Sequence, residues 1–216
     1  MVLYVDVSLL IRMESSRKFE SVFCADNDEF RASARLNYRF NRFDLYAIGY
    51  KDAADRLVEL VLSDSAGRDT QIYPITFLYR QYIELRLKQI IKEGRILMDE
   101  SEKLETMHYL KTLWTTAKKV INKIFEHEYD PSDSLQYAEH VILEFDKIDP
   151  NSTIFRYPID KEGNQNFTEI EYVNIRVLAL HVNELSEILD GITSSISAFL
   201  DDKGEMLSYS DVMNYD

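Results

Sequence analysis

The chain has 216 residues, of which 25 are basic and 38 acidic, and its net charge is −13. Apolar residues make up 45% of it, too many for a disordered chain, while six glycines and four prolines are too few for a fibrous one. The length suits one domain, with or without an appendage. The single cysteine, Cys24, excludes an internal disulfide framework and a cysteine-based zinc site.

The acidic charge is concentrated after residue 43. Residues 1–43 hold seven basic and six acidic side chains, which leaves 18 basic and 32 acidic side chains in residues 44–216. Such an acidic body repels phosphate backbones at long range, so a role with nucleic acid requires a local basic site.

The sequence does not predict a membrane protein. No apolar run approaches the roughly 18 residues that a transmembrane helix needs. The apolar start has no leading basic residues and no cleavage site typical of a signal peptide. We therefore expect no membrane partner and a reduced, cytoplasmic setting.

Residues 1–43 form the predicted N-terminal appendage. We expect residues 1–30 to be an irregular arm that can include short strands, because they contain short β-favouring stretches. Arg31, Arg35 and Arg39 recur every four residues, which on a helix makes one basic stripe. The favoured interpretation is a solvated face paired with carboxylates; the alternative is an edge that contacts the phosphates of a nucleic acid.

From Asp44 onward the apolar residues recur with a helical period, which predicts an all-α protein. The expected helices cover 44–63, 75–92, 108–125, a segment opened by Pro131 and Asp133, and a long last helix after a capping box at Thr168–Glu171. The bundle is expected to span residues 44–200, followed by an acidic tail, 201–216, that frays.

Two of these helices carry specific expectations. The helix over 75–92 is apolar on most of its circumference, so it is expected to be central, with Pro74 in its first turn and Gly94 as its stop. The last helix is expected to turn one apolar set inward and to leave a second set for a partner copy. The inward set is Val173, Val177, Leu180, Ile188, Leu189, Ile192 and Ile196, and the second set is Ile175, Leu178 and Leu185.

The first candidate site lies on the central helix. Arg80, Glu84 and Lys88 are spaced by four residues and share one face. They form either an exposed ladder of ion pairs, worth a few tenths of a kcal/mol per pair, or a buried polar cluster. The second interpretation gains weight from the apolar character of the helix, because buried charges must be paired or line a cavity.

The second candidate site is Arg176 with His181. An arginine and a histidine can cleave RNA without a metal, since histidine moves the proton of the 2′-hydroxyl and arginine stabilises charge on the phosphate. On an ideal helix the two side chains lie about 140° apart, so they would not converge within one chain. The favoured interpretation is therefore structural.

Other signals are weaker. His140 and Glu144 share a helical face near His127, but no third partner completes a metal site, and we expect neither a metal nor another cofactor. The connection over 149–167 is long for a helical bundle, which is typical of functional loops, and it contains Arg156.

Four segments in order resemble one superfamily: GYKDAADRLVELVL, YPITFLYRQYIELRLKQIIKEG, MHYLKTLW and, after an Asp-containing stretch, FRYP. The chain is similar over residues 44–200 to the HEPN (higher eukaryotes and prokaryotes nucleotide-binding) superfamily, in its branch of uncharacterised bacterial and phage proteins. The segments place Arg80, Glu84, His108, Arg156 and Tyr157 in one expected polar site.

The resemblance implies an up-and-down helical bundle that forms a homodimer. Catalytic members are metal-independent endoribonucleases with an Arg-x4–6-His motif, often toxins or defence effectors; other members are binding or scaffolding modules. Arg176 and His181 fit the motif by spacing, but active members usually carry a polar residue after the arginine, where this chain has Val177.

Two functions therefore remain open. The favoured one is a non-catalytic module that binds a nucleotide, RNA or a protein partner, in a bacterial defence or stress response. The alternative is a defence-type ribonuclease that uses Arg176 and His181 across a dimer.

Overall fold

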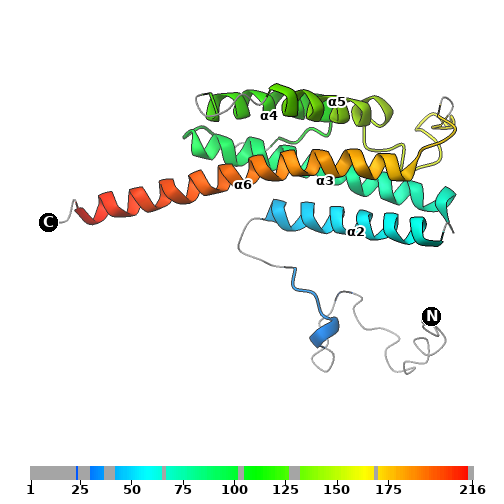
Figure 1. Ribbon diagram of the computed structural model, residues 1–216, viewed down its shortest axis with the longest axis horizontal. Helices are drawn as coiled ribbons and strands as arrows, with labels where there is room; N and C mark the ends of the chain where they lie inside the picture. The colour runs from blue at the N-terminus through cyan, green and yellow to red at the C-terminus, as the bar shows by residue number, and fades with distance from the viewer. Residues whose placement is uncertain are drawn as a thin grey trace. The chain divides into compact units, whose positions relative to one another are not determined.

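A computed structural model describes residue 23 and residues 30–36, 42–64, 67–101, 105–126, 132–167 and 170–213. The chain divides into two units, residues 1–40 and residues 41–216. The described part of the second unit is all-α, as predicted (Figure 1). Its helices are α2 (Arg42–Asp64), α3 (Arg68–Leu97), α4 (Leu110–Ile124), α5 (Ser132–Ile148) and α6 (Ile175–Met213).

Helix α3 is the centre of the bundle, as its apolar circumference predicts. It packs against α2, α4 and α6, while α5 lies against α4 and α6. Buried residues of α3 point in several directions, because neighbours cover more than one of its faces. The apolar ones are Ile75, Tyr79, Tyr82, Ile83, Leu87, Ile90 and Ile91.

The chain direction alternates along the bundle except between α3 and α4. Arg80 hydrogen-bonds to the carbonyl of His108, just before α4, and Gly94 packs against Val120 near the end of α4. These contacts mean that α3 and α4 run the same way, so the connection between them returns along the bundle (Figure 1).

The start of α3 and the role of Gly94 differ from the sequence-based expectation. The helix begins at Arg68, after Gly67 in the left-handed conformation (φ 72°), so Pro74 lies inside the helix rather than in its first turn. Gly94 does not end the helix, which continues to Leu97. A Cβ at Gly94 would lie 2.3 Å from Cγ1 of Val120, so this glycine permits close packing of α3 on α4.

The prediction of a capping box at Thr168–Glu171 is wrong. Thr168 and Glu169 lie outside the described residues, but α6 begins only at Ile175. Its cap is Asn174, whose Oδ1 accepts hydrogen bonds from the backbone N–H groups of Arg176 (3.1 Å) and Val177 (3.2 Å). An asparagine satisfies these otherwise unpaired donors as well as a threonine would.

The predicted inner face of α6 is also partly wrong. Val173, Val177 and Leu180 are exposed by 40%, 46% and 57%. Ile175 and Leu185, which were assigned to a partner copy, are instead buried within the chain. These two residues therefore give no argument for a homodimer, which stays a prediction. Helix α6 also continues past residue 200 to Met213.

The basic stripe of the N-terminal unit is not helical where the structure describes it. Helix η2 (Phe30–Ala32) is a short 3-10 turn, and residues 33–36 are not helical, so Arg31 and Arg35 do not share a helical face. Arg39 and most of the predicted irregular arm lie outside the described residues.

The connection from α5 to α6 spans residues 149–174, of which 168 and 169 lie outside the described residues. Residues 158–166 fold into a narrow turn, in which Ile159 and Gln165 form an antiparallel bridge and Asp160 accepts backbone hydrogen bonds from Glu162 and Asn164. This turn lets the loop present aromatic side chains beside the start of α3. Among the described helices, none is long and apolar enough to cross a membrane.

Candidate functional site

Arg80 lies at the centre of a buried polar cluster. Its side chain is fully buried, and every nitrogen of its guanidinium donates to the protein. The acceptors are the carbonyls of Asp149 (2.9 Å), His108 (2.8 Å) and Pro150 (3.3 Å), and Oε2 of Glu84 (3.0 Å). Arg80 therefore ties α3 to the segments before α4 and after α5.

Glu84 completes this cluster with its second oxygen. Oε1 accepts hydrogen bonds from Nζ of Lys88 (2.9 Å) and lies 2.7 Å from Nδ1 of His108. Burial raises the pKa of Glu84, but the hydrogen bonds and charges of Lys88 and His108 outweigh that effect and hold the pKa below its ordinary value. The interpretation of Arg80, Glu84 and Lys88 as an exposed ladder is therefore wrong.

The side chains of Arg80 and Glu84 are hydrogen-bonded within this cluster, whereas Oδ2 of Asp149, 3.9 Å from Nε of Arg80, is buried without a hydrogen-bond partner among the described residues. His108, with a side chain 64% exposed, is its most exposed described member, whereas the side chains of Lys88, Glu84 and Arg80 are 11%, 5% and 0% exposed. Buried charges that are fully paired fix the positions of the segments that carry them. We therefore interpret the cluster as a structural element that holds the α5–α6 loop in position, rather than as a ligand site.

Arg156 and Tyr157 do not belong to this cluster. Both side chains are exposed, and Nε of Arg156 donates to the carbonyl of Ser152 at 2.5 Å. The guanidinium carbon of Arg156 lies 5.8 Å from the ring centre of Phe77 and 5.5 Å from that of Tyr157. The structure thus brings Arg80, Glu84 and His108 together and leaves Arg156 and Tyr157 on the surface.

Arg176 and His181 are both exposed on α6. Because α6 is a continuous helix here, the two residues lie about 140° apart around its axis. Nδ1 of His181 lies 2.7 Å from the hydroxyl of Tyr137 on α5. Arg176 instead lines a groove to which His181 does not contribute.

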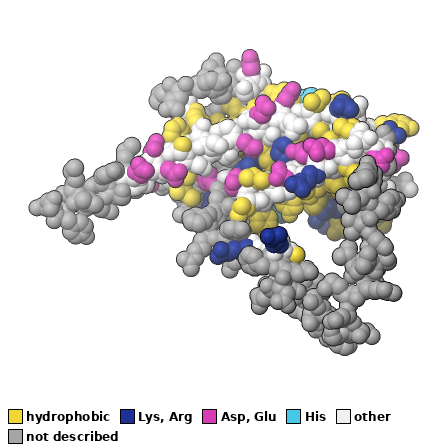
Figure 2. All heavy atoms as spheres, turned by 60° about the horizontal axis from the view of Figure 1, so that its bottom comes forward, with side chains coloured by type: hydrophobic (Ala, Val, Ile, Leu, Met, Phe, Trp, Pro, Cys, Tyr) yellow, Lys and Arg dark blue, Asp and Glu magenta, His cyan; other side chains and the backbone are white. Residues whose placement is uncertain are grey.

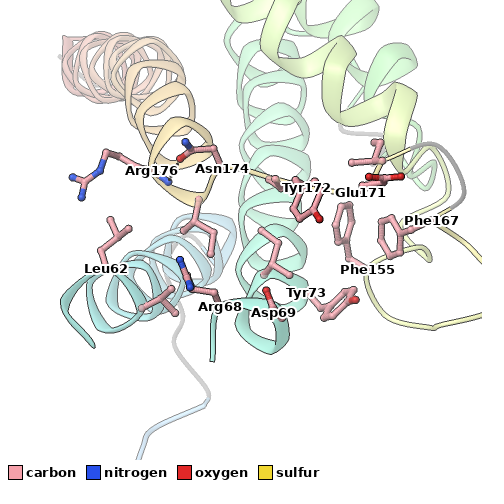
Figure 3. Close-up of a pocket in the computed structure, with 15 residues that line it drawn as sticks. Leu62, Arg68, Asp69, Tyr73, Phe155, Phe167, Glu171, Tyr172, Asn174 and Arg176 are labelled. Atoms are coloured by element: carbon pink, nitrogen blue, oxygen red, sulfur yellow. Dashed lines mark hydrogen bonds between the residues drawn. The ribbon is translucent and has the colours of Figure 1, made fainter. Parts of the chain in front are cut away.

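This groove has a volume of about 940 Å³. It lies where α2 ends, where α3 and α6 begin, and against the α5–α6 loop (Figure 3). Its lining residues are Val61, Leu62, Arg68, Asp69, Ile72, Tyr73, Phe155, Phe167, Ile170, Glu171, Tyr172, Val173, Asn174, Ile175 and Arg176. The volume is within the range of pockets that hold small ligands, about 300–1,000 Å³.

One half of the groove carries two arginines. Figure 3 shows Arg68 at the start of α3 and Arg176 at the start of α6, where its guanidinium extends outward from the rim. Among the described residues, none accepts a hydrogen bond from either guanidinium or forms an ion pair with it. The N-terminal ends of two helices add partial positive charge to the same half. This half is therefore suited to an anionic group.

The other half is aromatic. The ring centres of Phe155 and Phe167 lie 5.2 Å apart, and those of Tyr73 and Phe167 lie 5.8 Å apart. Tyr172 projects from the segment before α6 with 89% of its surface exposed. Phe155 is buried and Phe167 half-buried, so the exposed rings of this half are those of Tyr73 and Tyr172, which can stack on a flat ligand ring. Glu171 lies in this half and Asp69 lies nearer the middle (Figure 3). With Arg68 and Arg176, the lining therefore holds two acidic and two basic side chains.

The face of the molecule shown in Figure 2 carries mixed charges. Lysine and arginine side chains are interspersed there with aspartate and glutamate, and apolar side chains lie between them. A long nucleic acid needs a continuous basic track, which the described residues of this face do not form.

Within the described residues, no group of three or more histidine, cysteine, aspartate or glutamate side chains could hold a metal ion. Comparisons of the chain with family models, with curated proteins and with solved structures found no match. A functional proposal therefore rests on the groove itself.

Proposed function

We propose that the protein is a non-catalytic, HEPN-like helical module that binds a nucleotide in the groove, with its phosphate at Arg68 and Arg176 and its base at the aromatic half. The observation that carries this proposal is the pairing of two arginines that have no described partner with a cluster of aromatic rings in one groove of about 940 Å³. A role in bacterial defence or stress response remains part of the proposal through the HEPN resemblance alone.

The charge of the protein supports a small nucleotide over a long RNA. Two arginines can neutralise about two phosphate charges, while residues 44–216 carry 32 acidic against 18 basic side chains. Each further phosphate would lie near this acidic surface and be repelled. A nucleoside mono- or diphosphate, or the end of a short RNA, fits these limits.

The test is calorimetric titration of the protein with nucleoside monophosphates. Arg68→Ala and Arg176→Ala are each expected to weaken binding by about 10- to 100-fold, because a hydrogen bond to a charged group contributes roughly 1.5–3 kcal/mol. Arg56→Ala is the matched control, since Arg56 is an exposed arginine of α2 outside the groove. Equal loss in all three variants, or no binding to the unmodified protein, would contradict the proposal.

The alternative, a metal-independent ribonuclease, has one observation in its favour. The hydroxyl of Tyr137 lies 2.7 Å from Nδ1 of His181. The pKa of Tyr137 is raised to about 12, first by burial and second by the neighbouring carboxylate of Glu184. In the tautomer in which Nδ1 of His181 donates to this hydroxyl, Nε2 is the unprotonated ring nitrogen. The Nε2 atom can then accept the proton of a 2′-hydroxyl as its oxygen attacks the phosphorus.

This alternative predicts that the protein cleaves total RNA in the presence of EDTA and that His181→Ala abolishes the cleavage. His140→Ala, which changes an exposed histidine of α5, should retain it. Because Arg176 and His181 diverge on one helix, it also requires a homodimer, in which mixed Arg176→Ala and His181→Ala subunits regain activity. The non-catalytic proposal predicts no cleavage by the unmodified protein.

A further inference from the structure

The two halves of the groove would contact different parts of a nucleotide. The arginine half recognises a phosphate, which every nucleotide carries. The aromatic half can stack on any base, because every base has a flat face. Neither half therefore distinguishes one base from another, and discrimination requires a polar group that reaches the edge of the base.

Glu171 is such a group. It lines the groove in the aromatic half, in the same part of Figure 3 as Phe155 and Phe167. Its side chain is exposed, and no described residue donates a hydrogen bond to it or forms an ion pair with it. A carboxylate at neutral pH accepts hydrogen bonds and donates none.

The bases differ in how they meet an acceptor. Guanine carries an N–H and an amino group side by side, which match the two oxygens of a carboxylate. Cytosine and adenine carry one amino group, and carboxylates accept hydrogen bonds from the amino group of cytosine in known nucleic-acid complexes. Uracil offers a single N–H flanked by two carbonyl oxygens, and these two oxygens repel a carboxylate that accepts a hydrogen bond from the N–H between them.

We infer that Glu171 selects the base, so that the groove prefers guanine nucleotides, accepts cytosine and adenine nucleotides less tightly, and disfavours uracil nucleotides. This inference rests on the proposed nucleotide-binding function. It concerns a different part of the groove from the arginines, so the two can fail separately.

The experiment compares calorimetric affinities for GMP, CMP, AMP, UMP and ribose 5-phosphate. We expect GMP to bind about tenfold or more tightly than UMP. Glu171→Gln keeps the size of the side chain but adds a donor, so it should reduce the GMP-to-UMP ratio by about tenfold and leave the affinity for ribose 5-phosphate unchanged. Glu59→Gln, an exposed glutamate of α2 outside the groove, should keep the ratio of the unmodified protein.

The results of these titrations can overturn the inference in three ways. Equal affinities for GMP and UMP would overturn base selection and leave the proposed nucleotide binding intact. A ratio that falls in Asp69→Asn but not in Glu171→Gln would overturn the assignment to Glu171, since Asp69 is the other carboxylate of the groove. The absence of binding by all four nucleotides would overturn both the inference and the proposed function.

Discussion

Replacing Glu84 by alanine is expected to destabilise the protein by about 3–5 kcal/mol. The substitution removes the one carboxylate among the described residues that hydrogen-bonds to the fully buried guanidinium of Arg80, and leaves only the carboxylate of Asp149, whose Oδ2 lies 3.9 Å from Nε. Breaking a buried ion pair by removing one partner has about this cost. The free energy of unfolding in urea measures the effect, and a loss below 1 kcal/mol would show that the carbonyl acceptors of Arg80 suffice.

Glu100→Ala is the matched control. Glu100 pairs with Lys123 at 2.6 Å, but the two side chains are 42% and 61% exposed. Exposed pairs of this kind contribute less than about 1 kcal/mol, so this variant should unfold close to the unmodified protein.

The same cluster predicts a dependence on pH. The pKa of Glu84 is lower in the folded protein than its ordinary value of 4.5, so folding favours the ionised carboxylate. Its contribution to stability is complete above that value and is lost as the pH falls through the folded pKa. The difference in unfolding free energy between the unmodified protein and Glu84→Gln should therefore shrink on acidification, and a constant difference would contradict this account.

The second large effect is expected at Gly94. Gly94→Ala should destabilise the protein by about 1–3 kcal/mol, although alanine in a helix is otherwise favoured over glycine by roughly 1 kcal/mol. The added methyl would lie 2.3 Å from Cγ1 of Val120 and 3.0 Å from Cδ1 of Ile124, so α3 and α4 must separate. Valine is stiff at χ1 and cannot easily turn away.

Two variants separate this clash from helix propensity. Gly191 lies on the exposed side of α6 with nothing within 4 Å of a Cβ, so Gly191→Ala should stabilise by up to about 1 kcal/mol. In a Val120→Ala background, the cost of Gly94→Ala should shrink, because the two positions are in contact. Additive effects of Gly94→Ala and Val120→Ala would contradict the proposed contact.

The bundle could be predicted from the sequence where one periodic signal dominated. The spacing over 108–125 predicted helix α4, and the apolar circumference of α3 predicted its central position and gave weight to a buried Arg80. The inner face of α6 was partly missed, because its apolar residues surround the helix and the cap was predicted at Thr168, whereas the structure has it at Asn174. Gly94 was misread because a helix stop and a close helix contact both favour glycine.

The site was harder to predict, because it depends on tertiary contacts. The acceptors of Arg80 are backbone carbonyls of residues far along the chain, which no side-chain pattern reveals. The groove combines the end of α2, the starts of α3 and α6 and a loop. Arg176 was singled out for its spacing to His181, whereas in the structure it lines the same groove as Arg68, which no local motif connects to it.

The central claim, that a nucleotide occupies the groove, can be tested most directly by arginine footprinting. The protein is treated with phenylglyoxal with and without millimolar GMP, and the rate of modification of each arginine is followed by mass spectrometry. We expect GMP to slow the modification of Arg68 and Arg176 several-fold and to leave Arg56, which is exposed outside the groove, unchanged. Equal rates with and without GMP at Arg68 and Arg176, or protection that extends equally to Arg56, would contradict the account.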